Sequence, residues 1–415
     1  MPVIQAYISP GIMQAMTSSG RSMPRALVVG AGLNGLGVIR SLARAGVAVD
    51  LAGADPGAPG MSSRYGRKHR LSSSHGTALK EDLLRIAERE GWQGEARPVL
   101  FLTEEESVAS LRRDQTDLHG AFRFTLPHPA VLEKLMHKEG FRELAEAAGS
   151  PIPATRQIRE GEELDAAKDL RYPIVLKPGR RDAAYSARFR KAYRVESYAE
   201  LETLCHQIRP VLDDLVVQEW IEGRDSDIYF CLQYRSRKGK HLSFTGRKLR
   251  SWPPGVGGTA SCTAAPDVAE ELDHLTSDFF TATGVVGLAS MEFKRDARSG
   301  VFMMVEPTVG RTDYQEEVST LNGINIPYAA YLLELGLDIP EFRQSVRPVV
   351  WRDSRADRQS AAMTGQSVDL NGARVMDALW RRDDPGPKIA ELQTRIKTRA
   401  NRYLERLRRS GKAHT

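Results

Sequence analysis

The sequence predicts an α/β fold in roughly its first third and an α+β fold in the remainder. Apolar strand-like and amphipathic helix-like segments alternate from residue 26 to about residue 113, which is typical of a parallel sheet covered by helices. From about residue 172 onward the strand-like segments follow one another too closely for crossover helices, so we expect antiparallel pairing. With 415 residues, of which 41% are hydrophobic, the chain can build two or three domains with real cores.

In the first domain, apolar runs and helical spacing alternate along the chain. We expect a strand over residues 26–30, a turn over 30–37, a helix over 36–45, a strand over 47–52, a helix over 79–90, a strand over 98–102 and a helix over 104–113. The Gly, Pro and Ser-rich stretch at 53–66 predicts a loop at the carboxyl end of the second strand. The Pro-flanked segment at 126–130 marks the end of this domain.

The second half contains six strand-like runs. They are YPIVLKP (172–178), LVVQEW (215–220), SDIYFCLQY (226–234), HLSFTGRKLR (241–250), GLASMEFK (287–294) and VFMMVEP (301–307). A helical stretch over 131–149 precedes them, and an extended segment with two prolines follows that helix. Beyond residue 340 the periodicity is weak and places no elements.

Composition limits the classes of function. The net charge is +6, but the basic stretches at 179–194 and 388–412 lack the interleaved aromatic residues of a single-strand-binding surface, so we expect no nucleic-acid partner. The sequence contains no apolar run of about 20 residues, and residues 1–25 lack the pattern of a secretory signal. Three well-separated cysteines predict neither a disulfide framework nor a zinc site. We therefore expect a cytoplasmic protein without a membrane partner, in which 388–412 is a packing helix with a charged outer face.

A glycine-rich turn, VVGAGLNGLG at residues 28–37, follows the first strand. Its G-x-G-x-x-G spacing suits a tight turn with close backbone approach, as in dinucleotide-binding folds. Such folds also need an acid at the end of the second strand, but Asp50 lies inside that strand and Asp55 comes late in the loop. The residues alone therefore leave two interpretations open, a dinucleotide site or a turn kept for packing.

Further along, the stretch VVQEWIEG at 216–223 passes from an apolar strand into a linker. At Gln218, Glu219 and Ile221 this junction offers backbone N–H and C=O groups at the edge of an apolar slot. Such an arrangement suits an adenine ring.

Charged residues near this linker suit the rest of a nucleotide. Lys177 ends a predicted strand and places an ammonium group at its carboxyl end. Asp225 and Asp227 lie two apart on the next predicted strand, so they share a face and could accept hydrogen bonds from ribose hydroxyls. The alternative for each of them is ordinary surface charge.

Two acids stand on apolar strands that the turn-like RDARSG joins. Glu292 in LASMEFK and Glu306 in FMMVEP belong to this predicted hairpin. The expected register places Glu292 opposite Met304, so that Glu306 is a diagonal neighbour on the same face at about 7–8 Å between Cα atoms. Two such carboxylates repel unless a cation lies between them, and oxygen ligands together with phosphates suit Mg²⁺. The alternative, that both face solvent, is disfavoured by their apolar flanks.

Cations accompany these acids. Arg247, Lys248 and Arg250 precede the PPGVGG loop at 253–258, and cations beside a flexible loop fit an anionic substrate that is covered before reaction. Arg311 follows the second acid and offers a bidentate fork for a carboxylate or a phosphoryl group. We predict catalytic roles for Arg311, Lys248 and Arg247.

Taken in order, these residues resemble the ATP-grasp superfamily, and within it the carboxylate–amine ligases of the D-aspartate-ligase kind, over roughly residues 25–328. The segment Ser-Arg-Tyr at 63–65 belongs to this resemblance. It implies an ATP-grasp fold with an N-terminal Rossmann-like pre-ATP-grasp domain that binds no dinucleotide. The implied divisions are a tail at 1–24, the pre-ATP-grasp domain at 25–129, a small ATP-grasp subdomain at 130–213, a large subdomain with the metal site at 214–338 and a C-terminal extension at 339–415.

The resemblance also implies a role for each matching residue. These are nucleotide lysines at Lys138 and Lys177, an adenine hinge at Gln218 and the backbone of Glu219 and Ile221, a ribose ligand at Asp225 or Asp227, Mg²⁺ ligands at Glu292 and Glu306, and the arginine that follows them at Arg311.

The sequence departs from the family pattern in two places. Thr308 stands where the second acid's motif has an asparagine, which makes Thr308 a candidate third metal ligand, with Asn322 or Asn325 as substitutes. The loop after the second lysine is rich in arginine instead of glycine. We expect Arg180 and Arg181 to neutralise phosphate or to bind an anionic substrate.

The function that the resemblance implies is that of an ATP-dependent ligase that uses Mg²⁺. A carboxylate takes the γ-phosphoryl group of ATP to give an acylphosphate and ADP, and an amine then displaces phosphate to form an amide. Alternatives are an ATP-dependent carboxylase or carboxylate kinase on the same fold, an NAD-dependent oxidoreductase and a non-catalytic nucleotide-binding module. Expected partners are small carboxylate and amine substrates, such as an amino acid or a short peptide, and a homodimer is the default assembly.

Overall fold

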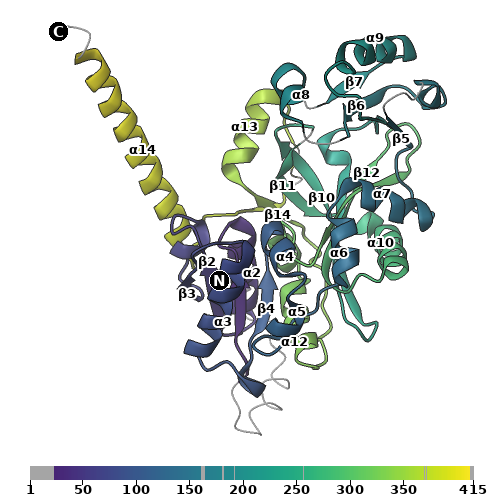
Figure 1. Ribbon diagram of the computed structural model, residues 1–415. Coiled ribbons are helices and arrows are strands. Elements are labelled where there is room, and N and C mark those ends of the chain that lie inside the picture. Colours follow the sequence, from purple (N-terminus) through teal and green to yellow (C-terminus); the bar gives the residue numbers. More distant parts are fainter. Residues whose placement is uncertain are drawn as a thin grey trace.

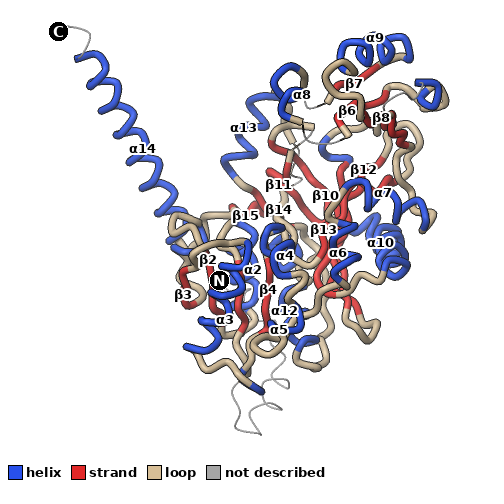
Figure 2. The backbone as a smooth tube through the Cα atoms, in the orientation of Figure 1, coloured by secondary structure: helices blue, strands red, loops and turns tan. Residues whose placement is uncertain are grey.

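Three sheets organise the chain in the computed structural model, which describes residues 23–411 except 160–163, 180–181, 191, 256, 369 and 371, with the backbone alone from residue 400 (Figure 2). The first sheet has four strands, the second four and the third seven. In this described range no helix combines the length and the apolar character needed to cross a bilayer.

The N-terminal sheet is parallel, with the strand order β3-β2-β1-β4. Its strands are β1 (Ala26–Val29), β2 (Val49–Gly53), β3 (Arg67–Arg70) and β4 (Val99–Leu102). Its helices are α2 (Leu33–Arg44), α3 (Gly76–Arg89), α4 (Glu105–Leu111) and α5 (Gln115–Leu118). Every residue of β1, β2 and β4 is buried, as in sheets covered on both faces. The parallel α/β arrangement predicted for this region is confirmed.

Strand β3 was not predicted. Its sequence, RKHR, is polar, and within it only His69 is buried. The strand lies at the edge of the sheet, where one side stays accessible, so it needs no apolar run to be stable.

The middle of the chain forms an antiparallel sheet with the order β5-β8-β6-β7. Its strands are β5 (Thr155–Ile158), β6 (Ile174–Pro178), β7 (Tyr193–Val195) and β8 (Leu215–Glu219). Helices α6 (Pro129–Leu135) and α7 (Lys138–Ala147) precede it, and α8 (Ala183–Arg188) and α9 (Tyr198–Ile208) belong to it. A core of its own, around Leu176, Leu201 and Val217, holds this unit together.

The large sheet has the order β13-β12-β9-β10-β11-β14-β15 and is antiparallel except for its last pair. Its strands are β9 (Ile228–Arg235), β10 (His241–Trp252), β11 (Gly258–Ala264), β12 (Gly287–Arg295), β13 (Phe302–Val309), β14 (Val349–Arg352) and β15 (Arg374–Asp377). Its helices are α10 (Ala269–Thr283), α11 (Glu317–Leu321), α12 (Ile326–Glu334) and α13 (Ser354–Thr364). The expected antiparallel character is confirmed, and the segment beyond 340, which the sequence left unplaced, adds two strands to this sheet.

Two hydrophobic cores join the N-terminal sheet to the large sheet, which lie side by side in Figure 1. One contains Leu27 of β1 together with Met291 of β12, and the other contains Val28 together with Phe230 of β9. Because both sheets share these cores, the loops between them are held in place.

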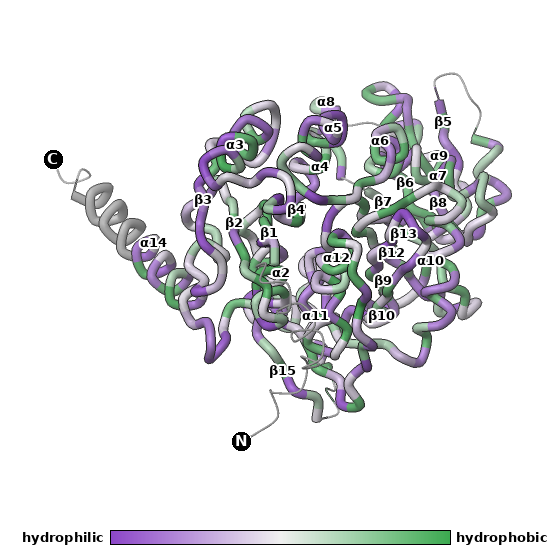
Figure 3. The backbone as a smooth tube through the Cα atoms, turned by 90° about the horizontal axis from the view of Figure 1, so that it is seen from below, coloured by the Kyte–Doolittle hydropathy of each residue, from purple (hydrophilic) through white to green (hydrophobic). Residues whose placement is uncertain are grey.

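The C-terminal helix α14 (Gly386–Gly411) extends away from the rest of the molecule in both views (Figures 1 and 3). Its first residue, Gly386, packs against the carbonyl oxygen of Ser62. Farther along, Ile389, Leu392 and Ile396 are 48%, 44% and 67% exposed. Near its start the helix contacts the turn Pro59–Ser62, so the expectation of a packing helix holds there and is wrong for the turns that follow, where these apolar side chains are exposed.

Candidate active site

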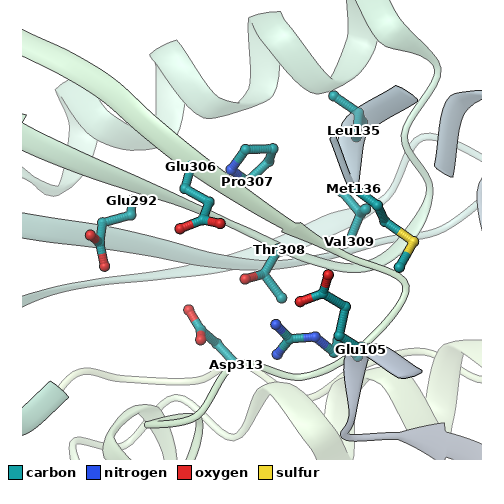
Figure 4. Close-up of a pocket in the computed structure, with 10 residues that line it drawn as sticks. Glu105, Leu135, Met136, Glu292, Glu306, Pro307, Thr308, Val309 and Asp313 are labelled. Atoms are coloured by element: carbon teal, nitrogen blue, oxygen red, sulfur yellow. The ribbon is translucent and has the colours of Figure 1, made fainter. Parts of the chain in front are cut away.

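A pocket of about 190 Å³ opens beside β12 and β13, where the large sheet meets the N-terminal domain (Figure 4). It is lined by Glu105, Leu135, Met136, Glu292, Glu306, Pro307, Thr308, Val309, Arg311 and Asp313. Figure 4 shows the carboxylates of Glu292, Glu306 and Asp313 and the hydroxyl of Thr308 directed toward a common space.

The two predicted metal acids are direct cross-strand partners. Glu292 pairs with Glu306, while the next residue, Phe293, pairs with Met304. The extra residue between them, Val305, forms a β-bulge and is 41% exposed. The predicted diagonal register is therefore wrong, and the two acids lie closer than expected, since direct partners have Cβ atoms about 4.5–5.5 Å apart.

Lys248 reaches this pair from β10. Its Nζ atom lies 2.6 Å from Oε2 of Glu292, and its side chain is 4% exposed. Burial raises the pKa of Glu292, Lys248 lowers it, and the nearby carboxylates of Asp313 and Glu306 raise it, so that the pKa stands above its ordinary value. The predicted catalytic lysine and both predicted metal acids are thus brought together.

Asp313 is a candidate that sequence reasoning missed. Its Oδ2 atom accepts a hydrogen bond from Oγ of Ser290 at 2.8 Å, and its Oδ1 atom accepts from the backbone N–H of Tyr314 at 2.7 Å. These bonds fix the carboxylate on the loop after β13. That loop has no periodicity, and the only signal in the sequence was one more acid two residues past Arg311.

The donors suit a hard divalent cation. Carboxylate oxygens from Glu292, Glu306 and Asp313 and the hydroxyl of Thr308 are ligands of the kind that Mg²⁺ takes. Across the described residues, no three Asp, Glu, His or Cys side chains converge closely enough to hold an ion alone. Because Mg²⁺ usually binds through one or two carboxylates plus waters and substrate phosphates, the donor set fits an ion that arrives with a nucleotide.

The side chains of the two asparagines considered as substitute metal ligands form hydrogen bonds with backbone groups. The side chain of Asn322 donates to the carbonyl oxygen of Val349 and accepts from its N–H. The side chain of Asn325 accepts from the N–H of Tyr328, which caps α12, and donates to the carbonyl oxygen of Ser41. The expectation that either could serve as a metal ligand is wrong, because their polar atoms already bind backbone groups.

The predicted nucleotide lysines lie near each other on the small sheet and the helix before it. Burial and, to a smaller extent, the charge of Lys138 lower the pKa of Lys177 to about 8. The Nζ atom of Lys177 also donates to Oε1 of Gln218 at 3.1 Å. An anion between the two lysines would relieve their repulsion. Arg180 and Arg181, which were expected to act beside them, lie outside the described residues.

The predicted adenine hinge consists of the last two residues of β8, Gln218 and Glu219, and the residues just after it. The N–H groups of Glu219 and Trp220 donate to the carbonyl oxygens of Ala154 and Pro173. By contrast, the N–H of Ile221 meets no acceptor among the residues that the structure describes. Within the described part of the chain, Ile221 is therefore the predicted hinge residue whose N–H has no protein acceptor.

The predicted ribose ligands lie on a short 3₁₀ turn, Asp225–Asp227, and not on a strand. The carboxylate of Asp225 accepts from the N–H groups of Ser251 and Gly255, both at 2.9 Å. That of Asp227 accepts from the N–H of Arg224 at 2.7 Å. The shared face expected for the two acids is wrong, because they lie on this turn and each carboxylate binds backbone N–H groups of its own surroundings.

The structure separates the two adjacent cations of β10. Successive residues of a strand face opposite sides of a sheet. Lys248 accordingly meets Glu292, whereas Arg247 lines a different pocket together with Asp225. Arg311 lines the first pocket, where its Nη1 atom donates to the carbonyl oxygen of Thr312 at 3.1 Å.

Two glycines of the G-x-G-x-x-G turn are required by packing. Gly30 has a φ of +100°, and a Cβ atom there would lie 2.2 Å from Oγ1 of Thr103. A Cβ atom at Gly35 would lie 1.9 Å from the carbonyl oxygen of Gly30. These contacts favour the interpretation of the turn as a strand–helix packing device.

The same turn holds the loop that carries Arg311 and Asp313. Asn34 donates to the carbonyl oxygens of Thr103 and Thr312 and accepts from Oγ1 of Thr312, over distances of 2.9, 2.9 and 2.7 Å. Asn34 is 7% exposed. The N-terminal domain therefore shapes the candidate active site through this side chain.

Asp50, the acid considered for a dinucleotide ribose, is fully buried in β2. It accepts hydrogen bonds from His69 and Arg67 at 2.7 Å each and from Arg25. Burial alone would raise the pKa of Asp50, but these three bonds lower it to about 2. Its oxygens are taken by protein partners, which argues against a dinucleotide at this position.

Comparison with known proteins adds two distant sequence relatives, and no family model matches the chain. The chain is 24% identical over 259 residues to D-aspartate ligase of Enterococcus faecium (strain Aus0004), covering 59% of this chain and 61% of that protein. It is 24% identical over 270 residues to formate-dependent phosphoribosylglycinamide formyltransferase of Dechloromonas aromatica (strain RCB), covering 62% and 64%. The chain thus spans a little under two thirds of the length of these relatives.

Solved structures show the same fold over about four fifths of the chain. N5-carboxyaminoimidazole synthetase of Staphylococcus aureus superposes with a TM-score of 0.59 at 13% identity, covering 80% of this chain and 82% of that one. The biotin carboxylase subunit of pyruvate carboxylase superposes with a TM-score of 0.59 at 15% identity, covering 79% and 74%.

Proposed function

We propose that this chain, a member of the ATP-grasp superfamily by its fold and by distant sequence similarity, is an ATP-dependent ligase that joins a carboxylate to an amine. The observation that carries the proposal is the group formed by Glu292, Glu306 and Lys248 at a polar pocket between the large sheet and the N-terminal domain. Similarity to a D-aspartate ligase supports an amino acid as the carboxylate substrate.

The small sheet would bind the nucleotide. Lys138 and Lys177 offer charge to its phosphates, and the N–H of Ile221 offers a donor to adenine. Mg²⁺, held by Glu292 and Glu306, would reduce the charge repulsion between the phosphates and the incoming carboxylate. In that state Lys248 would exchange its bond with Glu292 for a phosphate oxygen.

The reaction would have two steps. An oxygen of the substrate carboxylate bonds to the γ-phosphorus of ATP while the bond to ADP breaks, which gives an acylphosphate. The amine then bonds to the acyl carbon, phosphate leaves, and the amine proton passes to solvent. Arg311 and Lys248 would stabilise the negative charge that develops on the acyl oxygen. Glu105 would bind the amine substrate as its ammonium ion, which loses a proton to solvent before the neutral amine attacks.

Calorimetric titration with an ATP analogue and Mg²⁺, and separately with NADH, tests the nucleotide site before any substrate is known. We expect binding of the analogue, weakened by about tenfold or more in Glu306→Ala, and no binding of NADH. Binding of NADH without binding of the analogue would overturn the proposal.

Trapping of the intermediate then separates the ligase from its alternatives. With ATP, Mg²⁺ and hydroxylamine, the correct carboxylate should yield a hydroxamate and ADP. When the correct amine replaces hydroxylamine, the products should be an amide and ADP. Formation of ADP that requires bicarbonate would instead identify a carboxylase.

A further inference from the structure

A second pocket, of about 440 Å³, lies on the other side of β10 from the Lys248–Glu292 pair. Its walls come from the turn at 223–226, from β10, from the loop at 254–255, from the end of α13 and from the segment 366–368. A cavity of this size is ample for a small organic molecule, since such sites range over about 300–1,000 Å³.

The lining is rich in guanidinium groups. Arg224, Arg247 and Arg250 face the pocket, and Asp225 is the one carboxylate among its lining residues. Both oxygens of Asp225 accept backbone N–H groups, and among the described residues this carboxylate forms no ion pair with any of the three arginines. Arg250 donates to the carboxylate of Asp357 at 3.3 Å.

The other two arginines lack such partners. In the part of the chain that the structure describes, the guanidinium groups of Arg224 and Arg247 make no ion pair and no side-chain hydrogen bond. Arg224 is exposed and Arg247 is partly buried, and both line the same cavity. Guanidinium groups suit the bidentate binding of phosphate or carboxylate groups.

A buried hydroxyl points to the same conclusion. Ser360 of α13 lines the pocket and is 1% exposed, yet its Oγ atom has no hydrogen-bond partner among the described groups. A buried polar group without a partner is uncommon and calls for a ligand or an ordered water. Thr364, one helical turn further on, places a second hydroxyl in the lining.

We propose that this pocket binds a small organic anion that carries a phosphate or carboxylate group, held by Arg224 and Arg247 with Ser360 as a hydroxyl donor. It is separate from the proposed catalytic pocket, because Arg247 and Lys248 face opposite sides of the sheet. The inference does not depend on the proposed ligase activity.

Titration of the full chain with inorganic phosphate and with citrate, followed by calorimetry, tests the proposal. We expect at least one of the two anions to bind the wild type and to bind Arg247→Gln at least tenfold more weakly, with a smaller loss in Ser360→Ala. Phosphate without citrate identifies a phosphate ligand, and citrate without phosphate identifies a carboxylate ligand. The matched control is Arg358→Gln. Arg358 is an exposed arginine of α13, the helix that carries Ser360, and it does not line the pocket. This variant should bind the anions as the wild type does.

Lys177→Ala distinguishes this pocket from the proposed nucleotide site. Anion binding that persists in Lys177→Ala and weakens in Arg247→Gln supports the proposal. Binding that is lost in Lys177→Ala and kept in Arg247→Gln overturns it, as does a wild type that binds neither anion. If Arg247→Gln does not fold, as judged by circular dichroism, Ser360→Ala takes its place. Weaker anion binding by Ser360→Ala then supports the proposal, and unchanged binding overturns it.

Discussion

Among single residues, Lys248 is the cation that pairs with Glu292, and Glu292 shares the pocket with three more carboxylates, those of Glu105, Glu306 and Asp313. Lys248→Met would leave Glu292 partly buried without its cation. We expect a loss of about 1–3 kcal/mol in the free energy of unfolding at neutral pH, measured with urea. The double variant Lys248→Met/Glu292→Gln should recover most of it, and a double variant no more stable than the single one would contradict this account.

Lys177 should make nucleotide binding sensitive to mildly alkaline pH. Burial and the charge of Lys138 hold the pKa of Lys177 at about 8, so its cationic form is lost as the pH rises through that value. Affinity for an ATP analogue at fixed Mg²⁺ should fall between pH 7 and pH 9. In Lys177→Arg, whose side chain stays charged, calorimetry should show a flat profile. The same slope in both proteins would rule out Lys177 as the titrating group.

Asp50 should stabilise the fold in a pH-dependent manner. Its folded pKa of about 2 lies below the ordinary value of 3.8, so its contribution is complete above pH 3.8 and is lost as the pH falls toward 2. Asp50→Asn should cost about 2 kcal/mol at pH 7. Urea unfolding should show a smaller difference from the wild type at pH 3 than at pH 5. The exposed Asp55, changed to Asn, is the control that should show no such trend.

For whole elements, the sequence predicted which strands carry the acids but not how they pair. The bulge at Val305 moves Glu306 from the diagonal position to the direct one, and bulges depend on tertiary packing that a single strand does not encode. The loop predicted at 253–258 gives way at Gly258 to β11, a strand that was not predicted and that pairs with β10. The sequence also placed Asp225 and Asp227 on a strand. In the structure β9 begins at Ile228, and the two acids lie on the 3₁₀ turn before it.

The contact between the glycine turn and the loop after β13 gives a prediction about catalysis. Asn34→Ala removes three hydrogen bonds that hold Thr103 and Thr312, and it should cost about 1–3 kcal/mol of stability. If the proposed reaction is correct, kcat should fall by about tenfold because Arg311 and Asp313 lose their fixed positions, while KM for ATP changes little.

Asn322→Ala is the matched control for Asn34→Ala. Asn322 is also buried, at 0% exposed against 7% for Asn34, and it is bonded to backbone groups, but it anchors β14 and not the loop after β13. It should lower stability without lowering kcat. Equal effects of both variants on kcat would mean that Asn34 acts only through general stability.

At the scale of the whole molecule, a buried carboxylate near the C-terminus joins the last part of the chain to the N-terminal domain, and no local sequence pattern predicts this contact. Asp384 is fully buried, and its carboxylate accepts hydrogen bonds from Arg40 at 2.9 Å, from Oγ of Ser63 at 2.8 Å and from the N–H of Arg64 at 2.8 Å. The Ser-Arg-Tyr segment that carried part of the family resemblance thus binds the C-terminal segment. Local spacing cannot reveal such a partner, because Asp384 lies about 320 residues farther along the chain.

The helix that follows this contact gives the last prediction. Since α14 leaves the molecule and exposes Ile389, Leu392 and Ile396, a chain that ends after Gln393 should lose almost no packing. We expect its free energy of unfolding to stay within about 0.5 kcal/mol of that of the full chain. A melting temperature lower by about 5 °C or more would mean that α14 packs against a partner in solution. Sedimentation of both chains at two concentrations would then show whether that partner is a second copy, as the default expectation of a homodimer requires.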